Sequence, residues 1–115
     1  MIKKENALKK RKQFNYLFKN GNYFSNKYFS IVYLKLKTKN FKIGYSVSKK
    51  IGKAVVRNKT KRRLKEIVRK FSGQIKNEYY IIIQAKENIV SIPFNVLYDE
   101  VFASFEKIGL LYENN

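Results

Sequence analysis

The chain carries at residues 49–70 the stretch KKIGKAVVRNKTKRRLKEIVRK, in which eleven lysines and arginines accompany a single acid, Glu66. At about 100° per residue, one arc of a helix here gathers Val56, Thr60, Leu64, Ile67, Val68 and, just after the stretch, Phe71. Cations spaced four residues apart follow a second arc and comprise Arg57, Lys61, Lys65 and Arg69. The spacing predicts a helix that packs one stripe on a sheet and turns a basic stripe outward.

This density of like charge requires an anionic partner, because self-repulsion would otherwise destabilise the helix. The whole chain of 115 residues has a net charge of +18 and a pI near 10.1. A helix whose charges served only for solubility would mix the two signs. Because the nucleic-acid backbone is the common polyanion with a charge every few ångströms, we predict contact with RNA or DNA.

A membrane surface is the alternative polyanion. No apolar run approaches the roughly 20 residues needed to cross a bilayer, and the start, MIKKENALKKRK, lacks the apolar segment of a signal peptide. The chain also contains no cysteine, which is typical of a cytoplasmic protein without disulfides. We therefore expect a cytoplasmic location and no membrane partner.

The residue types present favour binding over bond cleavage. The chain has no histidine, the commonest general base and metal ligand. Its eight acids are scattered, and the neighbours Asp99 and Glu100 do not face a common point on a helix. Gly44, Gly52 and Gly73 lie too far apart to form a phosphate-binding loop. We expect no catalytic residue and no metal held by the protein alone.

The apolar patterns predict a single α+β domain at residues 8–112, which the charge indicates to be RNA- or DNA-binding, preceded by a flexible basic arm at residues 1–7. The expected elements are a helix at 8–19, an extended piece at 23–24, strands at 29–34 and 41–47, the basic helix, a strand at 79–84, and a last helix capped by Ser91. This order, αβββαβα, describes a sandwich with a mixed sheet and helices packed on it.

Two expectations concern how the strands connect. The polar connection at residues 37–40 is short, so strands 29–34 and 41–47 are expected to pair as an antiparallel hairpin. If strands 41–47 and 79–84 are parallel, the crossover through the basic helix is right-handed by the general rule.

A second binding surface is indicated by Phe14 and Phe18, one helical turn apart. Such a pair either packs in the core or forms a stacking platform at the edge of a cleft, with Lys10 beside it. Small side chains on the predicted strands have two interpretations as well, because they admit either a nucleotide strand or a packed helix. These small side chains belong to Ser30, Val32, Gly44, Ser46 and Ser48.

The segment IGYSVSKKIGKAVVRNKTKRRLKE resembles the hallmark of the bacterial ribonuclease P protein subunit, in which a VSKK-like strand end is followed by G-x-A-V-x-R-N-R-x-K-R. The resemblance extends from about Leu8 to Leu111, since LKKRKQFNYLFKNG resembles the family's first helix and EYYIIIQAK its D-Y-I-I-I-A-R strand. It implies a ribonucleoprotein subunit that helps to remove 5′ leaders from precursor tRNA, and an uncommon left-handed βαβ crossover.

The resemblance also implies roles for individual residues and partners. The RNA subunit and its Mg²⁺ cleave the phosphodiester, and one protein binds one RNA subunit and the precursor tRNA. Contact with the RNA subunit is expected at Lys49, Lys50, Lys53, Arg57, Asn58, Lys59, Lys61, Arg62, Lys65 and Arg69. The leader cleft is expected at Lys10, Phe14, Phe18, Ser30, Val32, Ser46 and Ser48.

Three positions depart from the family pattern. Lys59 and Lys65 stand where the family usually has arginine, and they keep the charge without the bidentate fork. Val32 replaces a residue that is aromatic in some members. The alternatives to this reading are a ribosomal or other structural RNA-binding protein, which shares small size and high charge, and a nuclease that acts without RNA.

Overall fold

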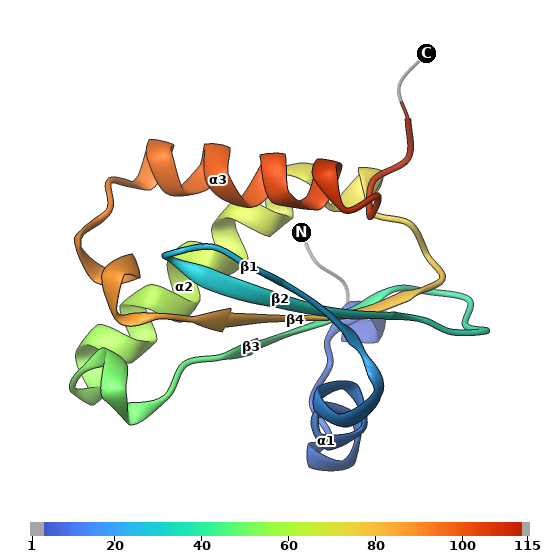
Figure 1. The fold of residues 1–115 in the computed structure, drawn as a ribbon, viewed down its shortest axis with the longest axis horizontal. Helices are drawn as coiled ribbons and strands as arrows, with labels where there is room; N and C mark the ends of the chain where they lie inside the picture. The colour runs from blue at the N-terminus through green and yellow to red at the C-terminus, as the bar shows by residue number, and fades with distance from the viewer. Residues whose placement is uncertain (1–3, 114–115) are drawn as a thin grey trace.

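The computed structural model describes residues 4–113 and has a four-stranded sheet with helices on both faces (Figure 1). The strands are β1 (Asn22–Ser25), β2 (Phe29–Lys35), β3 (Lys42–Ser46) and β4 (Tyr79–Ala85). The α-helices are α1 (Arg11–Asn20), α2 (Ala54–Phe71) and α3 (Phe94–Lys107). Short 3₁₀ helices are η1 (Lys4–Asn6), η2 (Lys49–Ile51), η3 (Ser72–Gln74) and η4 (Glu87–Ser91). None of the helices in residues 4–113 combines the length and apolarity needed to span a membrane.

The strand order is β1-β2-β4-β3, so the predicted hairpin between residues 29–34 and 41–47 is wrong. β4 lies between β2 and β3, antiparallel to the first and parallel to the second. The reason is its apolar run, because Ile81, Ile82 and Ile83 are all fully buried and need a covered neighbour on each side and each face. The short connection after β2 keeps the two strand ends near each other without making the strands pair.

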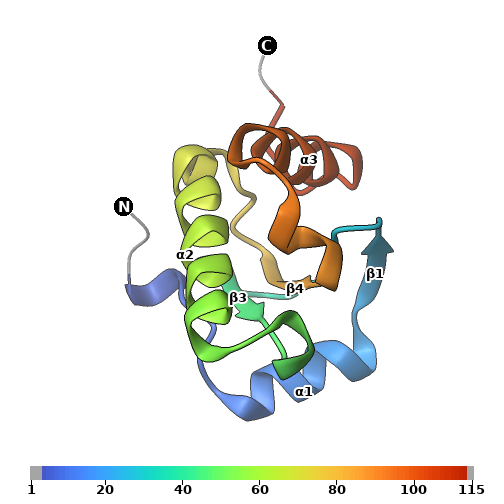
Figure 2. The same ribbon diagram turned by 90° about the vertical axis from the view of Figure 1, so that its left-hand side faces the viewer.

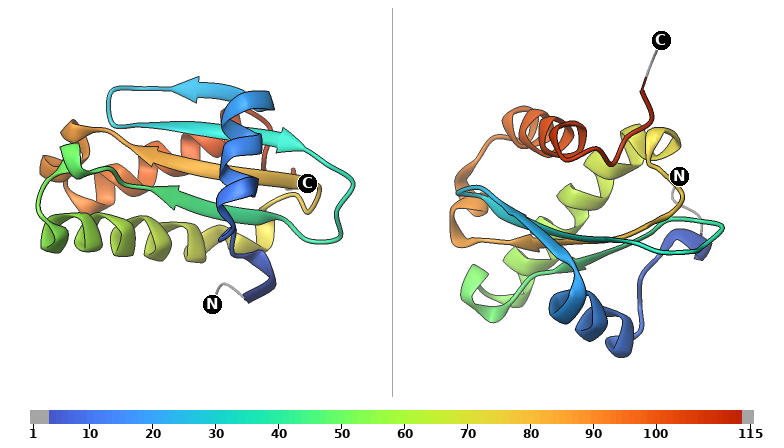
Figure 3. Two further views of the ribbon diagram at one scale, coloured as in Figure 1. Left: turned by 90° about the horizontal axis from the view of Figure 1, so that it is seen from below. Right: turned by 45° about the vertical axis from the view of Figure 1, so that its right-hand side comes forward.

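The β3–α2–β4 crossover is left-handed, as the family resemblance implies and against the general rule for parallel strands. In the view from below in Figure 3, β3 and β4 run in the same direction and α1 crosses in front of them. α2 returns on the opposite face of the sheet (Figures 1 and 3). A right-handed crossover would place α2 on the face that α1 covers. Gly52 turns the chain into α2 with a φ of 149°, which favours glycine.

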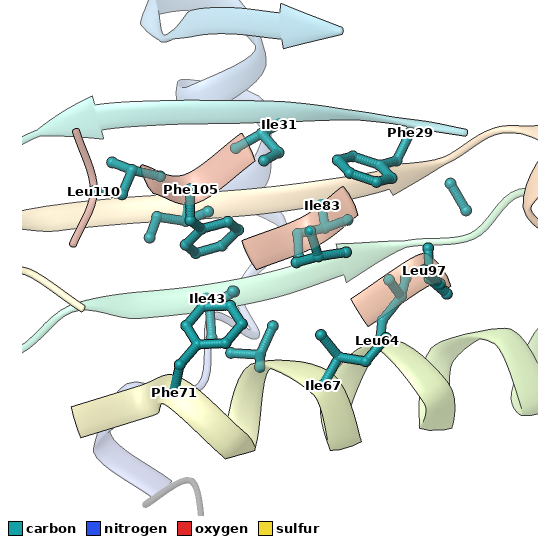
Figure 4. Close-up of a cluster of buried hydrophobic side chains, with 14 of the residues drawn as sticks. Phe29, Ile31, Ile43, Leu64, Ile67, Phe71, Ile83, Leu97, Phe105 and Leu110 are labelled. Carbon is teal, nitrogen blue, oxygen red and sulfur yellow. The ribbon is translucent and has the colours of Figure 1, made fainter. Parts of the chain in front are cut away.

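One face of the sheet is closed by α2 and α3. Figure 4 shows the side chains that meet there, among them Ile43 and Ile83 from the sheet, Leu64 from α2 and Phe105 from α3. Phe71 contacts the rings of Phe102 and Phe105 edge-on, with centroids 5.3 and 5.2 Å apart. The predicted apolar arc of α2 is confirmed, since all its members are buried except the half-buried Val56.

The other face is covered only where α1 crosses it (Figure 2). Leu8 and Leu17 pack there on Val32 of β2 and Ile82 of β4. Gly44 of β3 lies directly beneath Phe14, because a Cβ atom at this position would stand 2.5 Å from Phe14 Cζ. Here the small residue makes room for a packed helix, which was one of the two interpretations of the small strand positions.

Both ends of the domain differ from the prediction. Residues 4–7 are packed on the sheet rather than extended as an arm: Asn6 is buried and its side-chain amide donates to the carbonyl of Phe41 at 2.8 Å. Ala7 also bridges to Ile43. Residues 1–3 of the predicted arm lie outside the described residues. At the last helix Ser91 belongs to η4 and is not the cap, because Pro93 disfavours helical backbone at the residue before it.

Candidate nucleic-acid interface

The start of α2 concentrates positive potential. Lys53 occupies the N-cap position without a side-chain cap bond, and the first turn of Ala54–Phe71 contains no acid. Lys49 and Lys50 lie in η2 just before it, and Arg57 follows at the end of the first turn. The helix dipole adds about half a positive charge at the same end, where backbone N–H groups lack helical partners. This end of α2 is therefore suited to hold phosphate groups.

The predicted basic stripe faces solvent along α2. Lys65 and Arg69 are exposed, and Arg57 and Lys61 are half-buried against the rim of the core. The remaining predicted contacts are exposed too: Lys49, Lys50, Lys53, Asn58, Lys59 and Arg62. Within residues 4–113 a single ion pair forms, between Arg69 and Glu66. Nearly all of this charge is thus left without an acidic partner in the protein, which favours an external polyanion.

Arg63 lies on the opposite flank of α2 and serves the fold. Its guanidinium donates to the carbonyl of Ile92 at 2.5 Å and so ties α2 to the chain that enters α3. Arg63 is not among the predicted RNA contacts. The helical positions of Arg57, Lys61 and Lys65 turn those three side chains away from α3.

A cleft of about 710 Å³ opens at the end of the sheet where β2 begins and β4 ends, and none of its lining residues belongs to α1. Its floor includes Ser30 of β2 and Gln84 of β4, which are register partners and point to the same face. One wall of the cleft is the turn from β3 into α2, which contributes Ser48, Lys50 and Ile51. Because this turn leads directly into α2, the cleft and the basic helix share one rim.

Only some of the residues predicted to form the cleft line it in the structure. Ser30 and Ser48 line the cleft, whereas Ser46, the last residue of β3, is not among the residues that line it. Phe14 and Phe18 are half-buried, with ring centroids 6.5 Å apart, and pack on the α1-covered cluster. The packing interpretation is confirmed, whereas neither ring lines the cleft and the stacking platform stays a prediction.

Two residues predicted to lie in the cleft, Val32 and Lys10, lie elsewhere in the structure. Val32 is fully buried under α1, so its predicted place in the cleft is wrong and its role is packing. The reason is that α1 crosses the sheet directly over this position of β2. Lys10 is exposed at the N-cap position of α1 and is not among the residues that line the cleft.

A second wall of the cleft, at the β1–β2 turn and the end of β4, was not predicted and is formed by Lys27, Lys86 and Asn88. The Lys86 ammonium donates to Ser25 Oγ and to the carbonyl of Asn26, both at 2.6 Å. Asn88 donates from its side chain to the carbonyl of Lys27 at 3.2 Å. These bonds join the β1–β2 turn to the end of β4. Such long-range pairs carry no local signal, whereas Gln84 could have been found from the alternation along β4.

The chemistry available to the protein side chains is that of binding. Within residues 4–113 no three acidic, histidine or cysteine side chains gather closely enough to hold a metal ion. Burial raises the pKa of the Tyr45 hydroxyl, so this phenol stays protonated at neutral pH and cannot act as a base. A basic helix on the rim of a polar cleft is the arrangement of a nucleic-acid-binding domain.

Comparison with known proteins agrees with this class. The sequence model of the family described as Ribonuclease P matches residues 2–109. A ribonuclease P protein component from Syntrophomonas wolfei is 32% identical over 114 residues, and the match covers 99% of this chain and 96% of the relative's chain. One from Streptococcus thermophilus is 33% identical over 113 residues, covering 98% of this chain and 100% of its own.

Solved structures give the same result. The RNase P protein of Staphylococcus aureus superposes with a TM-score of 0.85 at 26% identity, over 93% of this chain and 98% of its own. The RNase P protein from Thermotoga maritima has a TM-score of 0.80 at 26% identity, over 94% of this chain and 98% of its own. The chain belongs to the ribonuclease P protein family. It is thus a protein component of a ribonuclease with an RNA partner.

Proposed function

We propose that this chain binds the RNA subunit of ribonuclease P through α2 and holds the 5′ leader of precursor tRNA in the cleft, so that the leader is removed and the mature 5′ end is formed. One observation carries the proposal: the basic stripe of α2, in which Arg69 alone has an acidic partner among the described residues, and the polar cleft meet at the turn of Ser48 and Lys50. Two RNA segments can therefore be held side by side by one small protein.

In this proposal the protein contributes electrostatics and shape, and the RNA subunit contributes the cleavage. The cations of α2 reduce the repulsion between two RNA backbones, which lowers the Mg²⁺ concentration that the RNA subunit needs. Mg²⁺ belongs to the RNA, and the protein holds no metal of its own. One protein acts with one RNA subunit, in the cytoplasm where precursor tRNA is made.

Reconstitution with a bacterial ribonuclease P RNA tests the proposal. We expect the protein to accelerate leader removal at Mg²⁺ concentrations where the RNA alone is slow, and to favour precursor over mature tRNA. The purified chain without RNA is the control and should leave the precursor intact. Cleavage by the protein alone, or no acceleration in its presence, would refute the proposal.

The alternative function, a structural protein of the ribosome, makes a different prediction. Such a protein would co-sediment with a ribosomal subunit and give no gain in leader removal. Sedimentation of cell extract, probed for this chain, therefore separates the two functions independently of the cleavage assay.

A further inference from the structure

We propose that Tyr23 is an aromatic platform on which one base of the 5′ leader stacks, at the β1 end of the cleft, and that it sets how far along the leader the protein makes contact. The inference rests on the proposed function, because its ligand is the single-stranded leader. In the sequence, Tyr23 stands out only as part of a short extended piece.

The Tyr23 ring is both exposed and fixed. It is 54% exposed on the edge strand β1. Its hydroxyl donates to the carbonyl oxygen of Phe18, near the end of α1, at 2.8 Å. A base that stacks on this ring finds it already oriented, so little side-chain entropy is lost on binding. Stacking on an aromatic face tolerates any base, which suits leaders of varied sequence.

Tyr23 points to the same face of the sheet as the cleft. In the β1–β2 register Tyr23 stands opposite Val32, and Ser25 stands opposite Ser30. Directly opposed residues of antiparallel strands share a face, and so do residues two apart on one strand. Since Ser30 lines the cleft, Ser25 continues its floor onto β1, and Tyr23 lies two residues further along β1, beside the part of the sheet that α1 covers.

A fixed cation lies between the cleft and Tyr23. The Lys86 ammonium is bound to Ser25 Oγ, on the residue two positions after Tyr23 and on the same face. Lys86 also lines the cleft. A leader that leaves the cleft toward β1 therefore passes a positive charge suited to its phosphate before it reaches the aromatic ring.

The geometry also predicts which part of the leader reaches Tyr23. With the order β1-β2-β4-β3, three strand spacings separate β1 from the β3 end of the cleft, or about 14 Å. About two to four nucleotides cover this distance. The β3 end adjoins α2, which holds the RNA subunit in our proposal. Tyr23 is then the distal contact, and a short leader cannot reach it.

The test measures the affinity of the reconstituted holoenzyme for mature tRNA and for precursors with leaders of about two and about eight nucleotides. We expect Tyr23→Ala to lose about tenfold in affinity for the long leader and nothing for the other two RNAs. Tyr23→Phe keeps the ring and should stay within about twofold of the wild type. Tyr16→Ala is the matched control, because Tyr16 is 52% exposed and lies about 200° around α1 from Phe18.

Each outcome decides between the claims. An unchanged affinity of Tyr23→Ala for the long leader, with the wild-type preference for precursor intact, overturns the role of Tyr23 and leaves the proposed function standing. An equal loss on mature tRNA overturns it as well, because that loss would be structural. A wild-type holoenzyme that binds precursor and mature tRNA equally refutes the proposed function, and the role of Tyr23 with it.

Discussion

The two faces of the sheet are covered to different depths. Twenty buried residues form the cluster under α2 and α3, whereas four, Leu8, Leu17, Val32 and Ile82, form the cluster under α1. The first face is closed along its whole length and holds the largest buried rings, Phe29, Phe71 and Phe105. The second face is covered only where α1 crosses it (Figure 3). Ser30 and Gln84, further along the same face, line the cleft.

This difference separates stability from binding. Burial of apolar surface is the main stabilising term, so the closed face supplies most of the free energy of folding. The second face, called the thin face because only α1 covers it, can leave a polar side chain such as that of Gln84 half-exposed, because the fold does not depend on covering it. The charge of α2 fits the same division, since one side of that helix packs and, among the described residues, only Arg69 on the other side has an acidic partner.

The largest expected effect comes from breaking the closed face. Phe71→Ala should lower the free energy of unfolding by about 4 kcal/mol, because it empties a fully packed site between α2 and α3. Leu17→Ala, at an equally buried residue under α1, should lower the free energy of unfolding by about 2 kcal/mol. The single helix α1 can shift into the cavity that the substitution leaves more easily than the packed pair α2 and α3 can. Urea unfolding at constant salt measures both. A larger loss for Leu17→Ala would show that the α1 face carries the fold.

An intermediate effect is expected from the basic stripe. Changing Arg57, Lys61 and Lys65 together to glutamine should weaken binding to the RNA subunit by about 100-fold near physiological salt, and should lower the salt slope by about two to three units. The matched control changes Lys35, Lys37 and Lys39, exposed lysines at the opposite end of the sheet from the cleft, to glutamine. The contact is rejected if both triple variants show the same slope in a titration at several salt concentrations.

The sequence predicts best where one residue type repeats with a fixed period. The period of α2 identified both its buried arc and its outward stripe, because helical geometry alone converts spacing into faces. The strand order could not be derived in this way. Nothing local records that β4 inserts between β2 and β3, and the short connection at residues 37–40 pointed to the wrong neighbour.

The candidate site shows the same limit. Ser30 and Ser48 could be chosen from strand alternation and from the family resemblance, and both line the cleft. Val32 has the same alternation as Ser30, but α1 crosses over one and not the other. The wall formed by Lys27, Lys86 and Asn88 depends on the hydrogen bond from Lys86 to the carbonyl of Asn26, sixty positions away in the chain. No periodic pattern in the sequence predicts such a pair.

The smallest of these effects concerns the rings at the boundary between the covered and the open part of the thin face. Phe14 and Phe18 pack on the α1 cluster and each keeps accessible surface, although neither lines the cleft. Changing both to leucine keeps apolar volume in the cluster and removes the aromatic faces, so stability should fall by only about 1 kcal/mol. Loss of one stacked base should lower the affinity of the holoenzyme for precursor tRNA about tenfold and leave mature tRNA unaffected. Competition binding with the two RNAs gives the ratio directly. Should both affinities fall together, the rings serve only the packing of α1, and the boundary of the cleft must be drawn between Phe18 and Ser30.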